Sequence, residues 1–250
     1  MAPDSGHPTS SPPTRRAQGR ARWRPYNRSV SSALQIGLIG GTGPEGRGLG
    51  LRLARAGAQV TIGSRSIERA REAVDRIRLR AGELGVKAAD NASIVDGCDV
   101  IVLAVPFAHA SVIVEKYAER FQPGSLLIDV TVPVMFVDRT PRLTDVPEGS
   151  ATEQIRRRLP SQIQLAAALK TVPASLLEGD QSLDCDEFVY GDSPEARSRA
   201  REILLLIPGL RPIDVGSLEA ARTIERMAVL AIAINRRYKI PDARFRVVGV

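Results

Sequence analysis

A glycine-rich turn that directly follows an apolar run constrains this chain more than any other feature. Residues 34–39 are nearly all apolar, as expected of a buried parallel strand, and the glycines after them follow the pattern G-x-G-x-x-G. After a strand and at the start of a helix, this pattern is typical of a dinucleotide-binding site. Gly41 permits the tight turn, Gly43 lets the backbone approach a pyrophosphate, and Gly46 allows the helix to pack closely. A glycine-rich turn without a ligand is the alternative.

The same turn predicts an anion site. Residues 43–56 are expected to form a helix, and the amide groups of the segment from Thr42 through Pro44 to Glu45 lie at its N-terminus. Unpaired amides and the helix dipole favour negative charge there. We therefore expect this segment to hold the pyrophosphate of a dinucleotide.

The end of the second predicted strand, residues 59–62, indicates which nucleotide is bound. Sites for NAD usually carry Asp or Glu at this point, where the carboxylate accepts from the ribose 2′-hydroxyl. Here the chain reads Gly63-Ser64-Arg65, and Arg69 follows one helical turn later. A hydroxyl and guanidinium groups attract a 2′-phosphate that a carboxylate would repel. Ser64, Arg65 and Arg69 thus predict NADP(H), although Arg65 could instead be a solvated surface arginine.

Strand and helix patterns alternate along the chain, which predicts an α/β fold with a doubly wound parallel sheet of the Rossmann type. The expected strands are residues 34–39, 59–62, 99–105, 125–129, 164–168, 187–190 and 211–215. The expected helices are residues 43–56, 66–81, 109–120, 152–159, 193–207 and 218–237. Residues 133–152 read as a long connection. We expect a disordered basic tail (1–32), an NADP-binding Rossmann domain (33–168) and a smaller C-terminal α/β lobe (169–250).

Composition excludes several other classes of function. Residues 1–32 hold six arginines and one aspartate, so they supply +5 of the net charge of +7, and nucleic-acid binding would depend almost wholly on that tail. No apolar run reaches the length of a membrane span. Two distant cysteines and two histidines predict neither a disulfide nor a metal site, and favour a reducing, cytoplasmic location. His109 is expected to pack at its helix start, so we assign no catalytic side chain.

Several separated motifs resemble one known family. Residues 40–50 with 62–66, then 105–110, 132–134, 170–174 and 207–214 are similar, in this order, to the NADPH-dependent reductases of the deazaflavin coenzyme F-420. The resemblance covers residues 35–247 and leaves the N-terminal tail outside it. It implies reversible hydride transfer between NADP(H) and coenzyme F-420, in which the coenzymes carry the chemistry and the protein supplies position.

The resemblance also implies a set of binding residues. Beyond the turn and the 2′-phosphate residues, further positions would line the NADP groove: Phe107, Ser111, Met135 and Ala174. Lys170 and Val172 would lie where nicotinamide and deazaflavin stack, and Ala243 would touch the deazaflavin. Lys170 stands where the family commonly has histidine, and Phe107 where tryptophan is common, so each change keeps a cation or an aromatic ring and implies altered binding rather than lost activity.

Two other functions fit parts of the sequence. An NADPH-dependent reductase of a small imine or carbonyl, similar to pyrroline-carboxylate reductases, would share the N-terminal half, and a non-enzymatic NADP(H)-sensing module would share the nucleotide site. The helix expected at residues 218–237 is apolar over a wide arc, which predicts either a central position in the second lobe or a homodimer interface.

Overall fold

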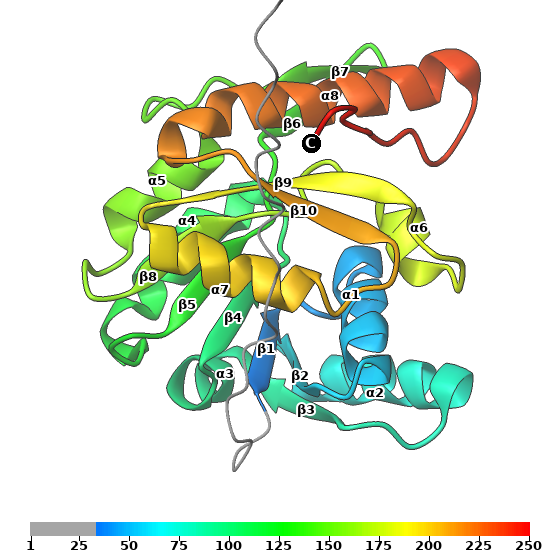
Figure 1. The fold of residues 1–250 in the computed structure, drawn as a ribbon. Coiled ribbons are helices and arrows are strands. Elements are labelled where there is room, and N and C mark those ends of the chain that lie inside the picture. Colours follow the sequence, from blue (N-terminus) through cyan, green and yellow to red (C-terminus); the bar gives the residue numbers. More distant parts are fainter. Residues whose placement is uncertain (1–33) are drawn as a thin grey trace, which may run out of the picture. The chain divides into compact units, whose positions relative to one another are not determined.

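An eight-stranded sheet runs through residues 34–250, the part of the chain that the computed structural model describes (Figure 1). Its strands are, in spatial order, β10 (Leu210–Asp214), β9 (Cys185–Gly191), β8 (Gln164–Ala167), β5 (Leu126–Asp129), β4 (Val100–Leu103), β1 (Gln35–Ile39), β2 (Gln59–Ser64) and β3 (Val86–Asp90). The six strands from β8 to β3 are parallel. The chain leaves β1 toward β2 and returns to pair β4 on the other side of β1, which makes the gap between β1 and β4 the switch point of the sheet.

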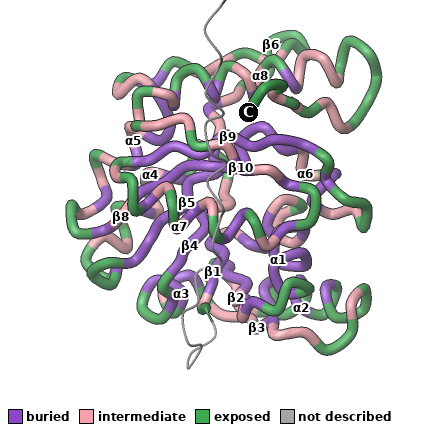
Figure 2. Tube along the Cα trace, in the orientation of Figure 1, coloured by how far each residue is buried: buried purple, intermediate pink, exposed green. Residues whose placement is uncertain are grey.

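Helices cover both faces of the sheet, and the strands divide their side chains between them. Ile36 and Leu38 of β1 pack with α1 (Pro44–Arg55), α2 (Ile67–Ala81) and α7 (Pro194–Leu204). Ile39 packs on the opposite face with α3 (Asn91–Gly97), α4 (Phe107–Lys116) and α5 (Ala151–Arg158). Figure 2 shows the buried strands in the centre and the exposed outer surfaces of the helices. The predicted α/β fold with a doubly wound, mostly parallel sheet is therefore confirmed.

The C-terminal third continues the same sheet in a different direction. β9 is antiparallel to β8, since Ala166 pairs with Gly191, and β10 is parallel to β9. Above this edge, α8 (Ala221–Tyr238) follows the short 3-10 helix η2 (Leu218–Ala220) and packs on a small third core that includes Phe188 and Tyr190. The sheet continues across the predicted boundary at residues 168–169. The division into an NADP-binding domain and a smaller lobe therefore remains a prediction about which part binds which coenzyme. The predicted tail, residues 1–32, lies outside the described residues.

Three groups of elements were not predicted from the sequence. They are the edge strand β3 with helix α3, the short helix α6 (Ala174–Glu178), and the hairpin of β6 (Val134–Val137) with β7 (Thr140–Leu143). The 3-10 turn η1 (Ala118–Arg120) falls within the helix predicted at residues 109–120. The hairpin lies in the segment that was predicted as a loop. Its turn residues Asp138 and Arg139 both have positive φ, at 48° and 62°. Hairpin turns of this conformation usually contain glycine or asparagine, and the sequence lacks both here. None of the helices in the described residues is long and apolar enough to cross a membrane.

Candidate functional site

Two adjoining hollows lie at the carboxyl ends of the central strands. The first has a volume of about 430 Å³ and the second about 350 Å³. They share the wall residues Gly43, Ala104, Val105 and Pro106, so they are the two halves of one groove. The groove crosses the switch point between β1 and β4, which is where open α/β sheets bind their ligands.

The glycine-rich turn forms the middle of this groove. Gly41 lies beneath it, and its N–H donates to the carbonyls of Leu38 at 3.1 Å and Gly63 at 3.0 Å. A Cβ on Gly46 would lie 2.5 Å from the Cα of Gly41, so close packing requires glycine at position 46. A Cβ on Gly43 would find nothing closer than 3.9 Å. Gly43 thus has open space above it, as a position that faces a ligand requires.

The N-terminus of α1 has no side-chain cap. The cap residue of this helix is Gly43, and Pro44 follows at the first helical position. By contrast, α2 and α5 are capped by the hydroxyl groups of Ser66 and Ser150. The first amides of α1 therefore lack a side-chain acceptor and remain available to an anion in the groove.

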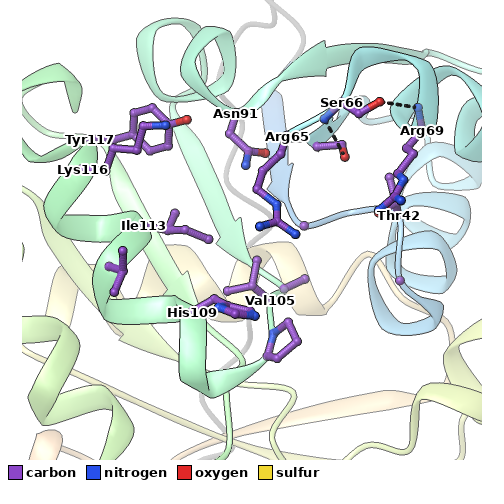
Figure 3. Close-up of a pocket in the computed structure, with 16 residues that line it drawn as sticks. Thr42, Arg65, Ser66, Arg69, Asn91, Val105, His109, Ile113, Lys116 and Tyr117 are labelled. Atoms are coloured by element: carbon purple, nitrogen blue, oxygen red, sulfur yellow. Dashed lines mark hydrogen bonds between the residues drawn. The ribbon is translucent and has the colours of Figure 1, made fainter.

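Positive charge gathers at the outer end of the first hollow, where Ser64, Arg65 and Arg69 all line the wall (Figure 3). Ser64 is buried at the end of β2, and its Oγ accepts from the Ser66 N–H at 3.3 Å. Arg65 and Arg69 are exposed, and neither forms an ion pair with another residue in the described range 34–250. Two unpaired guanidinium groups at the rim can bind a phosphate.

The second hollow contains the residues predicted for the other end of the nucleotide. The predicted residues that line it are Gly43, Pro44, Glu45, Phe107, Lys170, Val172 and Ala174. Five of the predicted residues line neither hollow: Gly41 and Gly46, which form the base of the turn, and Ser111, Met135 and Ala243. Met135 is exposed on β6 directly after Val134, which does line the second hollow. The N–H of Ala243 donates to Asn235 Oδ1 at 2.7 Å in the C-terminal segment.

Lys170 reaches the wall of the second hollow, but its ammonium group belongs to a fully buried ion cluster. Lys170 Nζ lies 2.7 Å from Asp129 Oδ2 and 3.2 Å from Glu225 Oε1, and it also donates to the Thr131 carbonyl. The side chains of all three charged residues are 0% exposed. Burial lowers the pKa of Lys170, but the neighbouring Asp129, Tyr190 and Glu225 outweigh it, and the net pKa is raised. Lys170 therefore stays protonated and holds two carboxylates in place.

The two carboxylates of this cluster connect four elements of the fold. Asp129, at the end of β5, accepts from the Thr131 N–H at 2.8 Å and from the Thr152 hydroxyl at 2.7 Å. Glu225 of α8 accepts from the Ala151 N–H at 3.2 Å at the start of α5. The cluster thus fixes the ends of β5 and α5 and the loop after β8 against α8. Sequence analysis assigned no role to Asp129 or Thr152, although an aspartate that ends a buried strand was a usable signal.

Two further carboxyl groups stand beside the second hollow. Burial raises the pKa of Glu45 to about 8, with a further contribution from Glu187 and an opposing one from Lys170. Burial also raises the pKa of Glu187 to about 7, although the Thr171 hydroxyl donates to it at 2.6 Å. This end of the groove therefore holds titratable protons near neutral pH. No group of His, Cys, Asp and Glu side chains in the described part of the chain is arranged to hold a metal ion.

Comparison with known proteins gives consistent matches. The sequence profile of the family described as "NADP oxidoreductase coenzyme F420-dependent" matches residues 35–133. The F420-dependent NADP reductase of Methanothermobacter thermautotrophicus is 37% identical over 223 residues, which cover 87% of this chain and 96% of the relative. The corresponding reductase of Methanocaldococcus jannaschii is 30% identical over 224 residues, or 87% and 99% of the two chains. A crystal structure of a proposed F420-dependent NADP-reductase from Arthrobacter sp. FB24 shares the fold, with a TM-score of 0.74, 24% identity, and coverage of 86% of this chain and 100% of that one.

Proposed function

This chain belongs to the family of F420-dependent NADP reductases, and we propose that it transfers a hydride reversibly between NADP(H) and the deazaflavin coenzyme F-420. The observation that carries the proposal is the continuous groove, with unpaired arginines at one end and a hollow lined by Phe107, Val172 and Ala174 at the other. The two relatives with this activity in their names match nearly their whole length to this chain.

The two coenzymes supply the hydride chemistry, from nicotinamide C4 to deazaflavin C5 or the reverse. The protein needs no nucleophile for this step, and its contribution is binding and orientation. Holding the reacting atoms about 3–3.5 Å apart makes such a step effectively unimolecular. We therefore assign positioning, rather than covalent chemistry, to the residues of the groove.

The first hollow and the turn suit the phosphates of NADP(H). The uncapped amides at the start of α1 would hold the pyrophosphate over Gly43, where the backbone leaves open space. Ser64, Arg65 and Arg69 would bind the 2′-phosphate. The two guanidinium groups complement a 2′-phosphate that NAD(H) lacks, so this end of the groove fits the phosphorylated nucleotide better.

The second hollow suits the reacting rings. Phe107, Val172 and Ala174 give it an apolar wall, and the buried cluster around Lys170 keeps its floor in place. The C-terminal segment would then border the deazaflavin, with Ala243 as the predicted contact, whereas Met135 of β6 remains a predicted contact of the NADP groove. Ser111 remains a predicted contact on the NADP side.

We also propose that the chain forms a homodimer through β6 and α8. Phe136 of β6 is 54% exposed and Leu230 of α8 is 52% exposed, and the two elements are joined where Arg236 lies 5.2 Å from the centre of the Phe136 ring. Exposed apolar side chains gathered on neighbouring elements often mark an interface. A dimer by sedimentation that the double substitution Phe136→Ser with Leu230→Ser converts to a monomer would support it.

A cytoplasmic location is consistent with the cysteines. Cys98 and Cys185 are both buried and free, as is usual for proteins of a reducing compartment. Cell fractionation with an antibody against the full chain would test this location.

The direct test of function mixes the purified full chain with NADPH and oxidised coenzyme F-420. We expect the visible absorbance of the deazaflavin to fall with time, and to fall more slowly when NADH replaces NADPH. Turnover of a pyrroline-type imine without any reaction of the deazaflavin would contradict the proposal and favour an imine reductase. Tight NADPH binding without turnover of either substrate would favour a sensing module.

A further inference from the structure

A buried asparagine in the wall of the first hollow has no partner for its carboxamide oxygen. Asn91 is only 3% exposed, and its Oδ1 makes no hydrogen bond to any described residue. It is the first residue of α3, and the side chain of the preceding Asp90 caps this helix, so the Asn91 side chain is not used for capping. A buried oxygen without a donor is unusual, because such groups are nearly always satisfied in folded proteins.

Of the surroundings of Asn91, only the hollow has room for a group that could donate a hydrogen bond to its carboxamide oxygen. On its inner side the side chain lies against Gly63 of β2, where an added Cβ would be 2.9 Å from Oδ1 and 2.3 Å from Ile94 Cδ1. This side is therefore closely packed by backbone and hydrocarbon. The same Asn91 lines the first hollow, together with the Arg65 side chain (Figure 3). A half-turn of the carboxamide exchanges Oδ1 with the NH₂ group, so a molecule bound in the hollow can supply the donor that Oδ1 lacks on the packed side.

The remaining walls of the hollow fit a flat aromatic base. Val105, Ile113 and Tyr117 supply apolar surface, and Asn91 is a neutral polar group among them. On the proposed function, the 2′-phosphate sits at Ser64 and Arg65, and the base attached to the same ribose must lie nearby in this hollow. Asn91 then faces a polar edge of that base while the apolar walls contact its faces.

We propose that the Asn91 carboxamide pairs with the adenine ring of NADP(H) and selects a 6-aminopurine over a 6-oxopurine. This inference rests on the proposed binding of NADP(H). Adenine presents a 6-amino donor beside the N7 acceptor, and the oxygen and NH₂ of an asparagine can pair with both. A 6-oxopurine places an acceptor where adenine has its donor, so two acceptors would face each other and Oδ1 would stay unpaired. Asn91 is thereby a specificity-determining residue, distinct from the arginines that read the phosphate.

The test compares binding of NADPH with binding of reduced nicotinamide hypoxanthine dinucleotide phosphate, which differs only at position 6 of the purine. We expect wild-type protein to bind the hypoxanthine nucleotide about 5- to 150-fold more weakly by calorimetry. In Asn91→Ala, the affinity for NADPH falls and the ratio between the two nucleotides approaches one. In Arg65→Ala, both affinities fall by the same factor and the ratio is unchanged.

The possible results separate this inference from the proposed function. If wild-type protein binds neither nucleotide, the proposed function fails. If wild-type protein binds both equally well, the inference is overturned while NADP(H) binding stands, and this comparison needs no variant to fold. A folded Asn91→Ala that keeps the wild-type ratio would overturn it as well.

Discussion

The two ends of the groove handle charge in opposite ways. At the first hollow, Arg65 and Arg69 are exposed, and neither is paired with a carboxylate from residues 34–250. At the second, Lys170, Asp129 and Glu225 are fully buried, and both carboxylates are paired with the Lys170 ammonium group. The first hollow therefore presents unpaired positive charge to a ligand, whereas the charges beside the second hollow are paired within the protein.

The physical reason for this difference is the cost of desolvation. An exposed arginine keeps its water until a phosphate replaces it, so it can remain unpaired without destabilising the fold. A buried charge destabilises the fold unless partners surround it, so the removal of one partner lowers the free energy of unfolding. We infer that the first hollow discriminates by charge and that the second depends on a rigid floor.

The largest effect is expected from breaking the buried cluster. Asp129→Ala removes the closest carboxylate partner of Lys170, at 2.7 Å, and also the acceptor of the Thr131 and Thr152 hydroxyls. We expect the free energy of unfolding to fall by about 3–5 kcal/mol in urea titrations, because a buried ammonium group is left partly uncompensated.

A surface ion pair supplies the control for this experiment. Asp96 pairs with Arg120, and both side chains are about half exposed. Asp96→Ala should cost about 0–1 kcal/mol, as exposed pairs usually do. Equal losses in the two variants would show that the Lys170 cluster does not carry the stability assigned to it.

The next effect is expected at the phosphate end. Arg65→Ala removes a charge that would bind the 2′-phosphate, which is absent from NADH. We expect the KM for NADPH to rise roughly 10- to 150-fold, as for the loss of a hydrogen bond to a charged group, while the KM for NADH changes little. Arg71→Ala, an exposed arginine of α2 that does not line the hollow, is the matched control. A similar rise for both nucleotides would contradict the role of Arg65.

Sequence analysis located the phosphate end well and the buried end poorly, for a physical reason. Gly43, Ser64 and Arg65 belong to a local strand–turn–helix pattern, so their spacing alone places them in one hollow. The contacts of Lys170 with Asp129 and Glu225 join residues 41 and 55 positions apart, and no local periodicity encodes them. Asn91 was missed because β3, with its sequence Val-Lys-Ala-Ala-Asp and only one buried residue, lacks the apolar pattern of the central strands.

A smaller effect concerns the pH dependence of stability at the second hollow. Glu45 titrates near 4.5 in an unfolded chain and at a pKa of about 8 in the folded protein. Between these values the folded protein holds a proton that the unfolded chain has lost, so rising pH favours unfolding. We expect the free energy of unfolding to fall from about pH 4.5 to about pH 8, and Glu45→Gln to flatten part of this slope.

The neighbouring groups define where this effect can be measured cleanly. The pKa of Glu187 is about 7, so its own contribution ends there, and the difference between wild type and Glu45→Gln from pH 7 to 8 belongs to Glu45. The hydrogen bond from the Ser66 side chain lowers the pKa of Glu68, which gives the opposite sign. Glu68→Gln should therefore alter the slope below pH 4.5 only. An unchanged slope in Glu45→Gln above pH 7 would contradict the protonated state of that carboxyl.

The smallest effect is expected from His109, which tests the contrast because its imidazole lines the hollow that we assign to nucleotide binding. It is exposed at the start of α4 and lines the first hollow but not the second. A general acid or base typically contributes 10²- to 10⁴-fold to a rate, whereas a wall residue of the nucleotide end contributes to binding. We expect His109→Gln to keep kcat within about tenfold of wild type and to change mainly the KM for NADPH. A loss of kcat above about a thousandfold would mean that proton transfer takes place in the first hollow. Our assignment of nucleotide binding alone to this hollow would then be wrong.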